Sequence, residues 1–550
     1  MKKIIINIGL IPGLFVLFSL NACKDKINPV VDELSFSRTF TPGEFSAQIS
    51  NITTVTLSWT TVKNVDHYVV EIYQGTDFVA GSLIFTTDLP APLSSVDKIS
   101  FAYVLPAGDT QFSARINAVS SLDGVAESKW ISVGFKSLPE NLFLGYISEL
   151  SGFKAVTVRW KPGSTATAVS FDNGTKTSYP ISAAEATAGV KIVTGVAKGK
   201  YQISLMNTTF VRGKTNVLVE GDVLLTPGSD LVAAINAAAP GNVIILPAGE
   251  IFKFAINSII NKSIKIRAIN KQNPPTLCAS SGASLTSPMF LIDPSLTSSD
   301  SIVFQNVIIT GYINNNVAEG LITGVYDQGT SNACNIGLLK FTGCELKHFS
   351  RHLIRLRGTA TQIIDRFEVN DCILSDYGTN STSYGIISSN TAAGTIKNIK
   401  FSNSTIYNFL SYLVLYTSGT SCNSVILNNC SLNQITYTPA STSRYIMDLN
   451  NTVFTGGGVN VSNCIFGSTA AAHTNGIRTS GTLLFTNTYC TSDYDDSFTP
   501  AYSVKSLMIA YSGASTALWT SPVAGTSEDF HFLDAGFAGK NSTGDPRWRP

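Results

Sequence analysis

The sequence predicts an all-β protein in which two N-terminal β-sandwiches precede a right-handed parallel β-helix. Three observations support this fold class. Short runs between about residues 36 and 224 alternate apolar and polar side chains, as half-buried strands do. A six-residue pattern recurs seven times between residues 304 and 490, at spacings that suit the coils of a solenoid. Only 14% of the residues are charged, below the usual level of about a quarter, and Ser, Thr, Asn and Gly take their place.

Length and charge limit the possible partners. A chain of 550 residues exceeds one ordinary domain, and typical domain sizes suggest roughly three or four. The 38 basic and 37 acidic side chains leave a formal charge of +1, so no overall field attracts nucleic acid or an anionic membrane. We therefore expect no nucleic-acid partner. With 44% hydrophobic residues, the chain can bury large cores.

The N-terminus carries an export pattern. A short basic region and a largely apolar run over residues 4–20 lead to Leu20-Asn21-Ala22-Cys23, which resembles a bacterial lipoprotein signal. The resemblance implies a signal peptide over residues 1–22, lipidation of Cys23 and a tether over residues 23–35. A transmembrane anchor is the alternative, but the apolar run is interrupted and short for a span. The expected location is the outer membrane, facing the cell surface or the periplasm, with acyl chains as the membrane contact.

Two segments carry sandwich patterns. Residues 36–138 contain a strand that ends at Trp59, an aliphatic strand, and a late strand of the form aromatic-x-x-Arg-x-x-Ala. This pattern resembles a fibronectin type III domain. A shorter version with Trp160 follows in residues 139–224 and predicts a second such domain. Because patterned strands turn large rings inward, both tryptophans are predicted to be core residues.

A helical segment then introduces the β-helix. Residues 230–239 have helical spacing with Ser229 or Asp230 as N-cap, and a Pro-Gly turn leads to a buried strand over residues 243–246. This order resembles the opening of pectin-lyase-like right-handed β-helices. An amphipathic cap there hides the open end of the first coil. The predicted β-helix covers residues 225–510, followed by a C-terminal cap or tail over residues 511–550.

The six-residue pattern has an apolar first position, Asn, Gly or Asp at the third and a small residue at the fourth. Its copies lie 24 to 37 residues apart. The third position predicts a left-handed turn and a ladder of Asn side chains. Four copies carry Cys at the fourth position, and we favour stacked free thiols over disulfides between coils. The copies begin at Phe304, Phe341, Val369, Phe401, Leu427, Val461 and Phe485.

The end of the chain carries a further resemblance. Asp529-Phe530-His531-Phe532 and Gly544-Asp545-Pro546-Arg547-Trp548 follow the β-helix. With the tandem sandwiches, this arrangement resembles uncharacterised Bacteroidota-type surface lipoproteins encoded in polysaccharide utilisation loci. The resemblance implies glycan utilisation, with an outer-membrane glycan uptake complex as a possible partner. It transfers no catalytic residue.

One dense group of charges lies between residues 345 and 376. Lyases of uronic-acid polymers need an Arg or a cation such as Ca²⁺ against the uronate, and a Lys, Arg or His as the base. The candidate catalytic residues are Lys347, His352, Arg355, Arg357 and Arg366, and the candidate Ca²⁺ ligands are Asp365, Glu368 and Asp371. We expect Arg355 and Arg357 on one strand face, with Arg366 and Glu368 one coil further on in the same groove. The alternative is a solvated ladder of ion pairs between coils.

Tyrosines are dense in the same region. Exposed rings can stack on pyranose faces. Tyr412 and Tyr416 have the even spacing of one strand face. The candidate sugar platforms are Tyr384, Tyr407, Tyr412, Tyr416 and Tyr445.

These observations lead to an outer-membrane lipoprotein whose β-helix binds a polysaccharide, with an acidic plant or algal glycan expected. A divergent Ca²⁺-assisted polysaccharide lyase is the alternative, since the paired motifs of pectate lyases and polygalacturonases are missing. A structural or adhesion protein without sugar specificity is the third possibility.

Overall fold

A computed structural model gives the structure of the protein. It describes residues 36–92, 97–143, 149–255, 257–283, 286–329, 332–378, 383–410, 412–436, 443–470, 473–523, 525 and 528–550. The predicted signal peptide, Cys23 and the tether lie outside these residues. The chain divides into two compact units, with the boundary between Glu140 and Asn141. No helix in the described ranges is long and apolar enough to cross a membrane.

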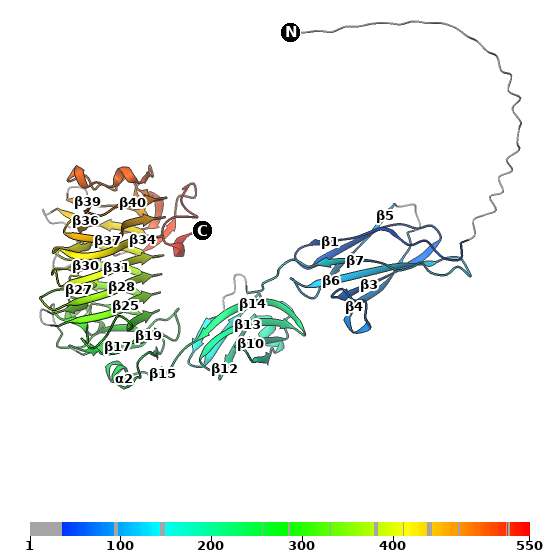
Figure 1. Cartoon of the computed structure of the whole chain (residues 1–550), viewed down its shortest axis with the longest axis horizontal. Coiled ribbons are helices and arrows are strands. Elements are labelled where there is room, and N and C mark those ends of the chain that lie inside the picture. Colours follow the sequence, from blue (N-terminus) through cyan, green and yellow to red (C-terminus); the bar gives the residue numbers. More distant parts are fainter. Residues whose placement is uncertain are drawn as a thin grey trace, which may run out of the picture. The chain divides into compact units, whose positions relative to one another are not determined.

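The first unit is a sandwich of two antiparallel sheets (Figure 1). Its core contains Trp59 and Tyr68, whose ring centroids lie 5.5 Å apart, and both rings are fully buried. One sheet has the order β1(Gly43–Ser50), β2(Thr54–Thr60), β5(Lys98–Val104). The other has the order β4(Leu83–Pro90), β3(Val65–Gln74), β6(Gln111–Ser120), β7(Ile131–Lys136).

The second sandwich repeats this strand order. Trp160 is fully buried in its core, as predicted. A short helix, α1(Ala183–Ala188), is held by a capping box between Ser182 and Glu185. The three-stranded sheet has the order β12(Val190–Thr194), β9(Ala155–Arg159), β8(Glu149–Gly152). The four-stranded sheet has the order β11(Lys176–Pro180), β10(Ala168–Asp172), β13(Gly199–Asn207), β14(Phe210–Val219).

The rest of the chain winds through three parallel sheets, so that each coil adds one strand to each sheet (Figure 1). This arrangement confirms the predicted parallel β-helix. The first sheet consists of β15(Val223–Leu224), β16(Asn242–Leu246), β19(Ile264–Ala268), β22(Ser301–Gln305), β25(Cys334–Thr342), β28(Gln362–Asn370), β31(Gly394–Ser402), β34(Thr420–Asn428), β37(Thr452–Ser462) and β40(Leu483–Thr486). The second consists of β17(Ile251–Phe254), β20(Thr276–Ala279), β23(Ile308–Thr310), β26(Glu345–Phe349), β29(Ile373–Tyr377), β32(Thr405–Phe409), β35(Ser431–Ile435), β38(Ile465–Phe466), β41(Tyr489–Cys490) and β42(Ile509–Ala510). The third consists of β18(Ile259–Ile260), β21(Pro288–Ile292), β24(Gly324–Gln328), β27(Ile354–Leu356), β30(Gly385–Ser389), β33(Tyr412–Tyr416), β36(Arg444–Leu449) and β39(Thr474–Thr479).

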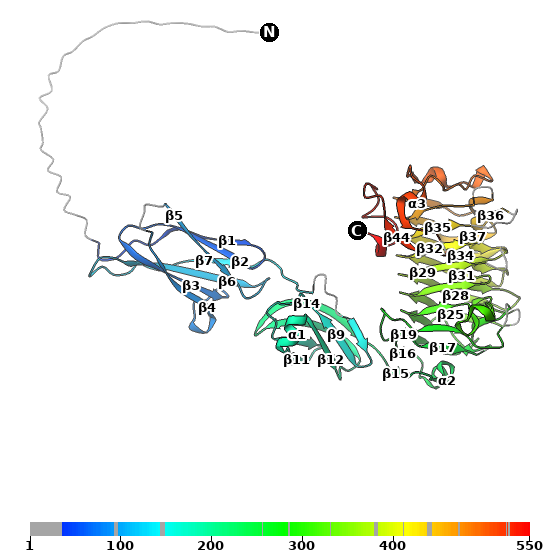
Figure 2. The same cartoon turned by 180° about the vertical axis from the view of Figure 1, so that it is seen from behind.

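The predicted cap is a helix, α2(Leu231–Ala237), next to the first coils (Figure 2). Its N-cap is Asp230, whose carboxylate accepts a hydrogen bond of 3.0 Å from the backbone N–H of Ala233. Leu231 and Ile235, one turn apart, are buried in the core of the β-helix. The apolar stripe of this helix therefore covers the end of the solenoid.

The six-residue pattern marks the turn from the first sheet to the second. All seven residues at its third position have positive φ, between 44° and 63°, as predicted. Their side chains form a ladder: the Asn429 amide donates to Asn403 at 3.1 Å, and the Asn487 amide donates to Asn463 at 2.8 Å. The cysteines at the fourth position are buried free thiols, and the backbone N–H of Cys344 lies 3.4 Å from the Cys372 sulfur. The cysteines of these coils therefore pack as free thiols, as predicted, and form no disulfides between coils.

The C-terminal segment folds back along the outer face of the second sheet, shown in red in Figure 2. It contains α3(Ser515–Leu518), β43(Trp519–Ser521) and β44(Asp529–Phe532), and its rings pack on Tyr407 and Ile465. Its last residues form what we call the strap, residues 543–549. The strap donates or accepts hydrogen bonds at Asp371, Thr405, Asn429, Ser431 and Asn463, which belong to four successive coils.

Candidate functional site

The outer face of the third sheet carries a line of residues in register from coil to coil. Asp327 pairs with Arg355, Arg355 with Ser388, Ser388 with Leu415, Leu415 with Asp448, and Asp448 with Arg478. A charged pair thus lies at each end of the line. Tyrosine and further arginine side chains lie around each pair.

The first group, the Asp327 cluster, consists of Asp327, Arg351, His352, Arg355, Arg357 and Tyr384. The side chain of Asp327 is only 2% exposed. Its carboxylate accepts a hydrogen bond of 2.7 Å from Arg357 Nε, and its other oxygen lies 3.8 Å from Arg355. Arg355 Nε also donates to the Asn390 side-chain oxygen at 2.9 Å, which fixes the guanidinium from its second side.

Tyr384 covers this cluster. The guanidinium carbon of Arg355 lies 4.4 Å from the centre of the Tyr384 ring, and that of Arg351 lies 5.4 Å from it. Both distances are within the range of cation–π attraction. Tyr384 itself is half-buried, so part of its ring faces solvent. The ring and the two guanidiniums together form a positively charged surface.

His352 lies beneath Tyr384, with the two ring centroids 5.9 Å apart. Its ring is fully buried and lies against Gly324, where an added Cβ would come within 2.5 Å of the imidazole. Its Nε2 lies 3.5 Å from the Asp327 carboxylate, and neither ring nitrogen has a hydrogen-bond partner among the described residues. His352, one of the five predicted catalytic residues, therefore lies under the surface rather than on it.

Burial dominates the electrostatics of this cluster. It lowers the pKa of His352 well below the usual value, and the charges of Arg355, Arg351 and Arg357 lower it further. It also raises the pKa of Asp327, although the three arginines act in the opposite direction. The imidazole is therefore neutral at pH 7. Arg355 and Arg357 pair with the Asp327 carboxylate and Arg351 adds a third guanidinium, so positive charge is in excess in this partly desolvated site.

A second group, the Asp448 cluster, consists of Asp448, Arg444, Arg478, Tyr412, Tyr445 and Tyr502. Asp448 lies four strands further along the sheet than Asp327, about 19 Å away at the usual strand spacing. Arg478 donates to both oxygens of Asp448, with Nε at 2.9 Å from the first. The guanidinium carbon of Arg478 lies 4.4 Å from the Tyr445 ring centre and 5.9 Å from that of Tyr502. Arg444 lies 5.8 Å from the centre of the Tyr412 ring. Predicted platforms Tyr412 and Tyr445 therefore share one face with Tyr384.

The expected groove of Arg355, Arg366 and Glu368 is wrong. Arg355 lies on β27 in the third sheet, whereas Arg366 and Glu368 lie on β28 in the first sheet. The chain turns once between β27 and β28, so Arg355 and Arg366, eleven positions apart, lie on different faces. Lys347 lies on a third face, because β26 belongs to the second sheet. There its amine contacts Glu345 at 2.8 Å.

The predicted metal ligands are held by basic side chains instead. Asp365 pairs with Lys397 at 2.6 Å, Glu368 with Lys340 at 3.0 Å, and Asp371 with Arg547 at 2.7 Å. The first two pairs join adjacent coils of the first sheet, which is the ion-pair ladder foreseen as the alternative. Within the described ranges, no group of three or more His, Cys, Asp or Glu side chains could hold a metal ion.

Two of the predicted sugar platforms are buried. Tyr416 is 1% exposed and its hydroxyl donates to the Ile396 carbonyl at 3.1 Å inside the β-helix, so its prediction as a platform is wrong. Tyr416 points inward with Val414 into the apolar core, whereas Tyr412 at the start of the same strand contacts Arg444 outside it. The expected shared face of Tyr412 and Tyr416 is therefore wrong. Tyr407 is 7% exposed on the second sheet, where its ring packs on Phe530.

Several residues of the two clusters were not predicted. Asp327 lies in an apolar strand 28 positions before Arg355, and Asp448 lies 30 positions before Arg478. Only their coil-length spacing connects each carboxylate to its arginine. A search for opposite charges separated by one coil would have found both pairs.

Comparison with protein-family models and with curated proteins finds no match. Three solved structures are similar at 10–14% identity: a two-domain fibronectin type III segment of chicken tenascin, domains FN1–FN3 of chicken CNTN1 and the central fibronectin III array of RIM-binding protein. They cover 32%, 34% and 36% of this chain and 98%, 68% and 66% of their own, with TM-scores of 0.21, 0.15 and 0.13. Apart from these structures, both sandwiches have a three-stranded and a four-stranded antiparallel sheet with the same strand order. This arrangement agrees with the predicted fibronectin type III-like fold.

Proposed function

We propose that this protein is a lipid-anchored outer-membrane protein that binds an acidic polysaccharide along the third sheet of its β-helix. The observation that carries the proposal is the Asp327 cluster, where Arg355 and Arg357 pair with one buried carboxylate and the guanidinium of Arg351, unpaired among the described residues, lies with that of Arg355 at the Tyr384 ring. A uronate carboxylate would complete the charge balance, and a pyranose face would stack on Tyr384.

The two clusters favour a chain over a small molecule. They lie about 19 Å apart on one sheet face, each with arginine and tyrosine side chains, so one extended polymer can contact both. The export pattern ending at Cys23 supports attachment to the outer membrane, and the fibronectin type III-like domains would serve as spacers. The resemblance to polysaccharide-utilisation lipoproteins makes a glycan uptake complex the expected partner.

Affinity gel electrophoresis of the full chain against acidic and neutral polysaccharides tests this proposal. We expect retention by at least one acidic polymer, weakened by salt, because screening reduces charge-based binding. Arg351→Gln should weaken retention by roughly tenfold, since Arg351 has no ion-pair partner among the described residues. The matched control is Arg366→Gln, an exposed arginine on the first sheet. Equal effects of the two changes, or equal retention by neutral polymers, would overturn the proposal.

A parallel ultraviolet assay for unsaturated uronates, with and without Ca²⁺, separates binding from the lyase alternative. Binding without turnover is the expected outcome, because the His352 ring is buried beneath Tyr384 and cannot contact a polymer in this conformation. Product formation that disappears in Arg355→Gln would instead identify a lyase. Lack of retention by every polymer would favour an adhesion protein.

A further inference from the structure

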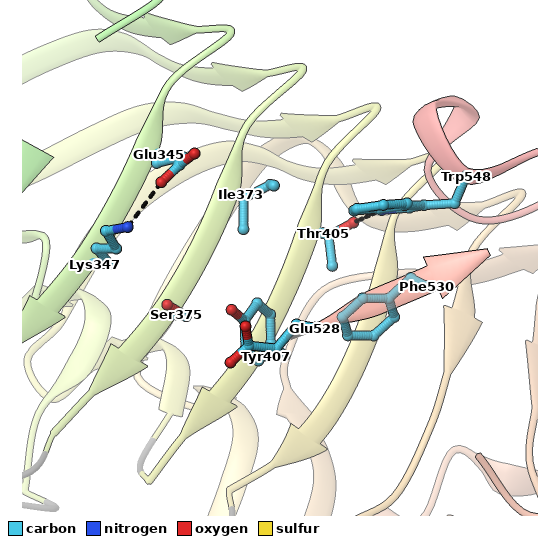
Figure 3. Close-up of a pocket in the computed structure, with 9 residues that line it drawn as sticks. All are labelled: Glu345, Lys347, Ile373, Ser375, Thr405, Tyr407, Glu528, Phe530 and Trp548. Carbon is cyan, nitrogen blue, oxygen red and sulfur yellow. Dashed lines mark hydrogen bonds and ion pairs between the residues drawn. The ribbon is translucent and has the colours of Figure 1, made fainter. Parts of the chain in front are cut away.

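A pocket of about 210 Å³ lies between the second sheet and the C-terminal segment, on a different face from both clusters (Figure 3). Strands β26, β29 and β32 supply one wall, and residues around β44 and the strap supply the other. The pocket is smaller than the roughly 300–1,000 Å³ of sites for drug-sized ligands. Its volume therefore suits one sugar residue rather than a length of chain.

The polar lining of the pocket has an excess of negative charge. Glu345 and Glu528 line it together with one cation, Lys347, which contacts Glu345 at 2.8 Å. Glu528 accepts a hydrogen bond of 3.0 Å from the Gly525 backbone N–H, and it forms no ion pair among the described residues. The lining therefore carries a net charge of about −1, opposite in sign to the Asp327 cluster.

Aromatic side chains form the rest of the lining. Figure 3 shows the Trp548 ring across one side of the pocket and the Glu528 carboxylate beside Tyr407. The indole N–H of Trp548 donates to the Thr405 hydroxyl at 2.7 Å, which fixes the plane of the ring. The ring is half-buried, so part of it remains available for stacking. Burial, together with Glu528 and other nearby carboxylates, raises the pKa of Tyr407, so its hydroxyl stays a hydrogen-bond donor.

From this geometry we infer a second saccharide site, specific for a single amino sugar. The protonated amine would lie against Glu528, the carboxylate without an ion-pair partner among the described residues, and the pyranose would contact Trp548. Acidic sugars are disfavoured by the net negative charge of the lining. The inference extends the proposed glycan binding to a second face but does not depend on the Asp327 cluster, because none of its residues lines the pocket.

Isothermal titration calorimetry of the full chain in detergent micelles tests this site. The probes are the methyl glycosides of glucosamine, glucose and glucuronic acid at about pH 6, where the amine is protonated and an ordinary glutamate is ionised. We expect the glucosamine derivative to bind about tenfold tighter than the glucose derivative, and the glucuronic acid derivative to bind most weakly. Comparable affinity for the amino and acidic sugars would overturn the inference, as would no binding of any probe.

Two substitutions in opposite directions sharpen the test. Glu528→Gln should remove the preference for glucosamine, whereas Lys347→Gln should strengthen it, because each changes the pocket charge by one unit. Glu44→Gln in the first sandwich is the matched control. Unchanged glucosamine affinity in Glu528→Gln would contradict the inference. Arg351→Gln should leave this affinity intact, so failure here and failure of acidic-polymer binding are distinguishable.

Discussion

The first and third sheets of the β-helix both present charged outer faces, but the charged side chains of the two faces differ in their exposure to solvent. On the first sheet, Arg366 is 57% and Lys397 42% exposed, and each carboxylate pairs with a cation on a neighbouring coil. On the third sheet, Arg355 is 13% exposed and Asp327 2%. Water satisfies the excess cations of the first face, whereas those of the third face are partly removed from water. Hydration, rather than the number of charges, therefore separates an ion-pair ladder from a candidate binding site.

The largest expected contrast comes from removing one carboxylate on each face. Asp327→Asn leaves Arg355 and Arg357 without their buried partner and should lower the free energy of unfolding by about 3 kcal/mol. Glu368→Gln on the first sheet should cost less than about 1 kcal/mol, because its partners are partly exposed. Urea unfolding followed by circular dichroism measures both. Similar losses would show that the two faces do not differ in desolvation.

The third sheet should also make the stability of the protein depend on pH, whereas the first sheet should not. His352 stays neutral in the fold because its pKa is depressed, whereas the unfolded chain takes up this proton below about pH 6.5. Stability should therefore fall as pH drops from about 7 to about 5.5, by up to about 1.4 kcal/mol per unit. The raised pKa of Asp327 acts in the opposite sense, adding stability that is lost as pH rises, in a window that begins near its ordinary value.

Unfolding titrations of His352→Gln and wild type check this dependence. The variant should lose the slope in that range, while Glu368→Gln should keep it. A wild-type slope that survives in His352→Gln would assign the acid sensitivity to other groups.

The Tyr384 ring on the third sheet should contribute to ligand binding rather than to folding. Tyr384→Ala removes the ring over Arg355 and Arg351 and should weaken acidic-polymer retention by about tenfold, or 1–2 kcal/mol. Tyr103→Ala, a partly exposed tyrosine of the first sandwich, is the control in the affinity gel. Retention unaffected by Tyr384→Ala would remove the ring from the proposed site.

The smallest effect is expected on the first face. Arg366→Gln should change stability by less than about 0.5 kcal/mol and leave polymer retention unchanged, because its contact with Glu368 is long, at 3.5 Å, and mostly exposed. Thermal unfolding and the affinity gel check both. A clear loss of retention would extend the binding surface to the first sheet.

The fold could be predicted from sequence because its signals are local. The residue at the third position of each repeat, such as Asn403 or Asn463, must adopt positive φ at the same turn of every coil. The N-cap at Asp230 and the buried ring of Trp160 likewise follow from short patterns. Each needs only a few neighbouring residues to be recognised.

The site could be predicted only in part, because it is assembled across coils. The dense charges from Lys347 to Arg366 are close in sequence, but the coil distributes them over three sheets. Asp327 reaches Arg355 only because one full coil separates them. The pocket at Trp548 depends on the return of the C-terminal segment, which follows no repeat. Local patterns contain no information on either contact.

The strap has a mechanical consequence. In a solenoid each coil contacts only its neighbours, so a pull at the C-terminal end would detach coils one after another. Asp545 and Arg547 instead connect Thr405, Ser431 and Asp371, and the Gly544 N–H is bonded to the Asn463 carbonyl at 2.9 Å. The strap therefore holds four coils at once, so that they cannot separate one after another. Under load, the four coils joined by the strap should yield in one abrupt step rather than unravel.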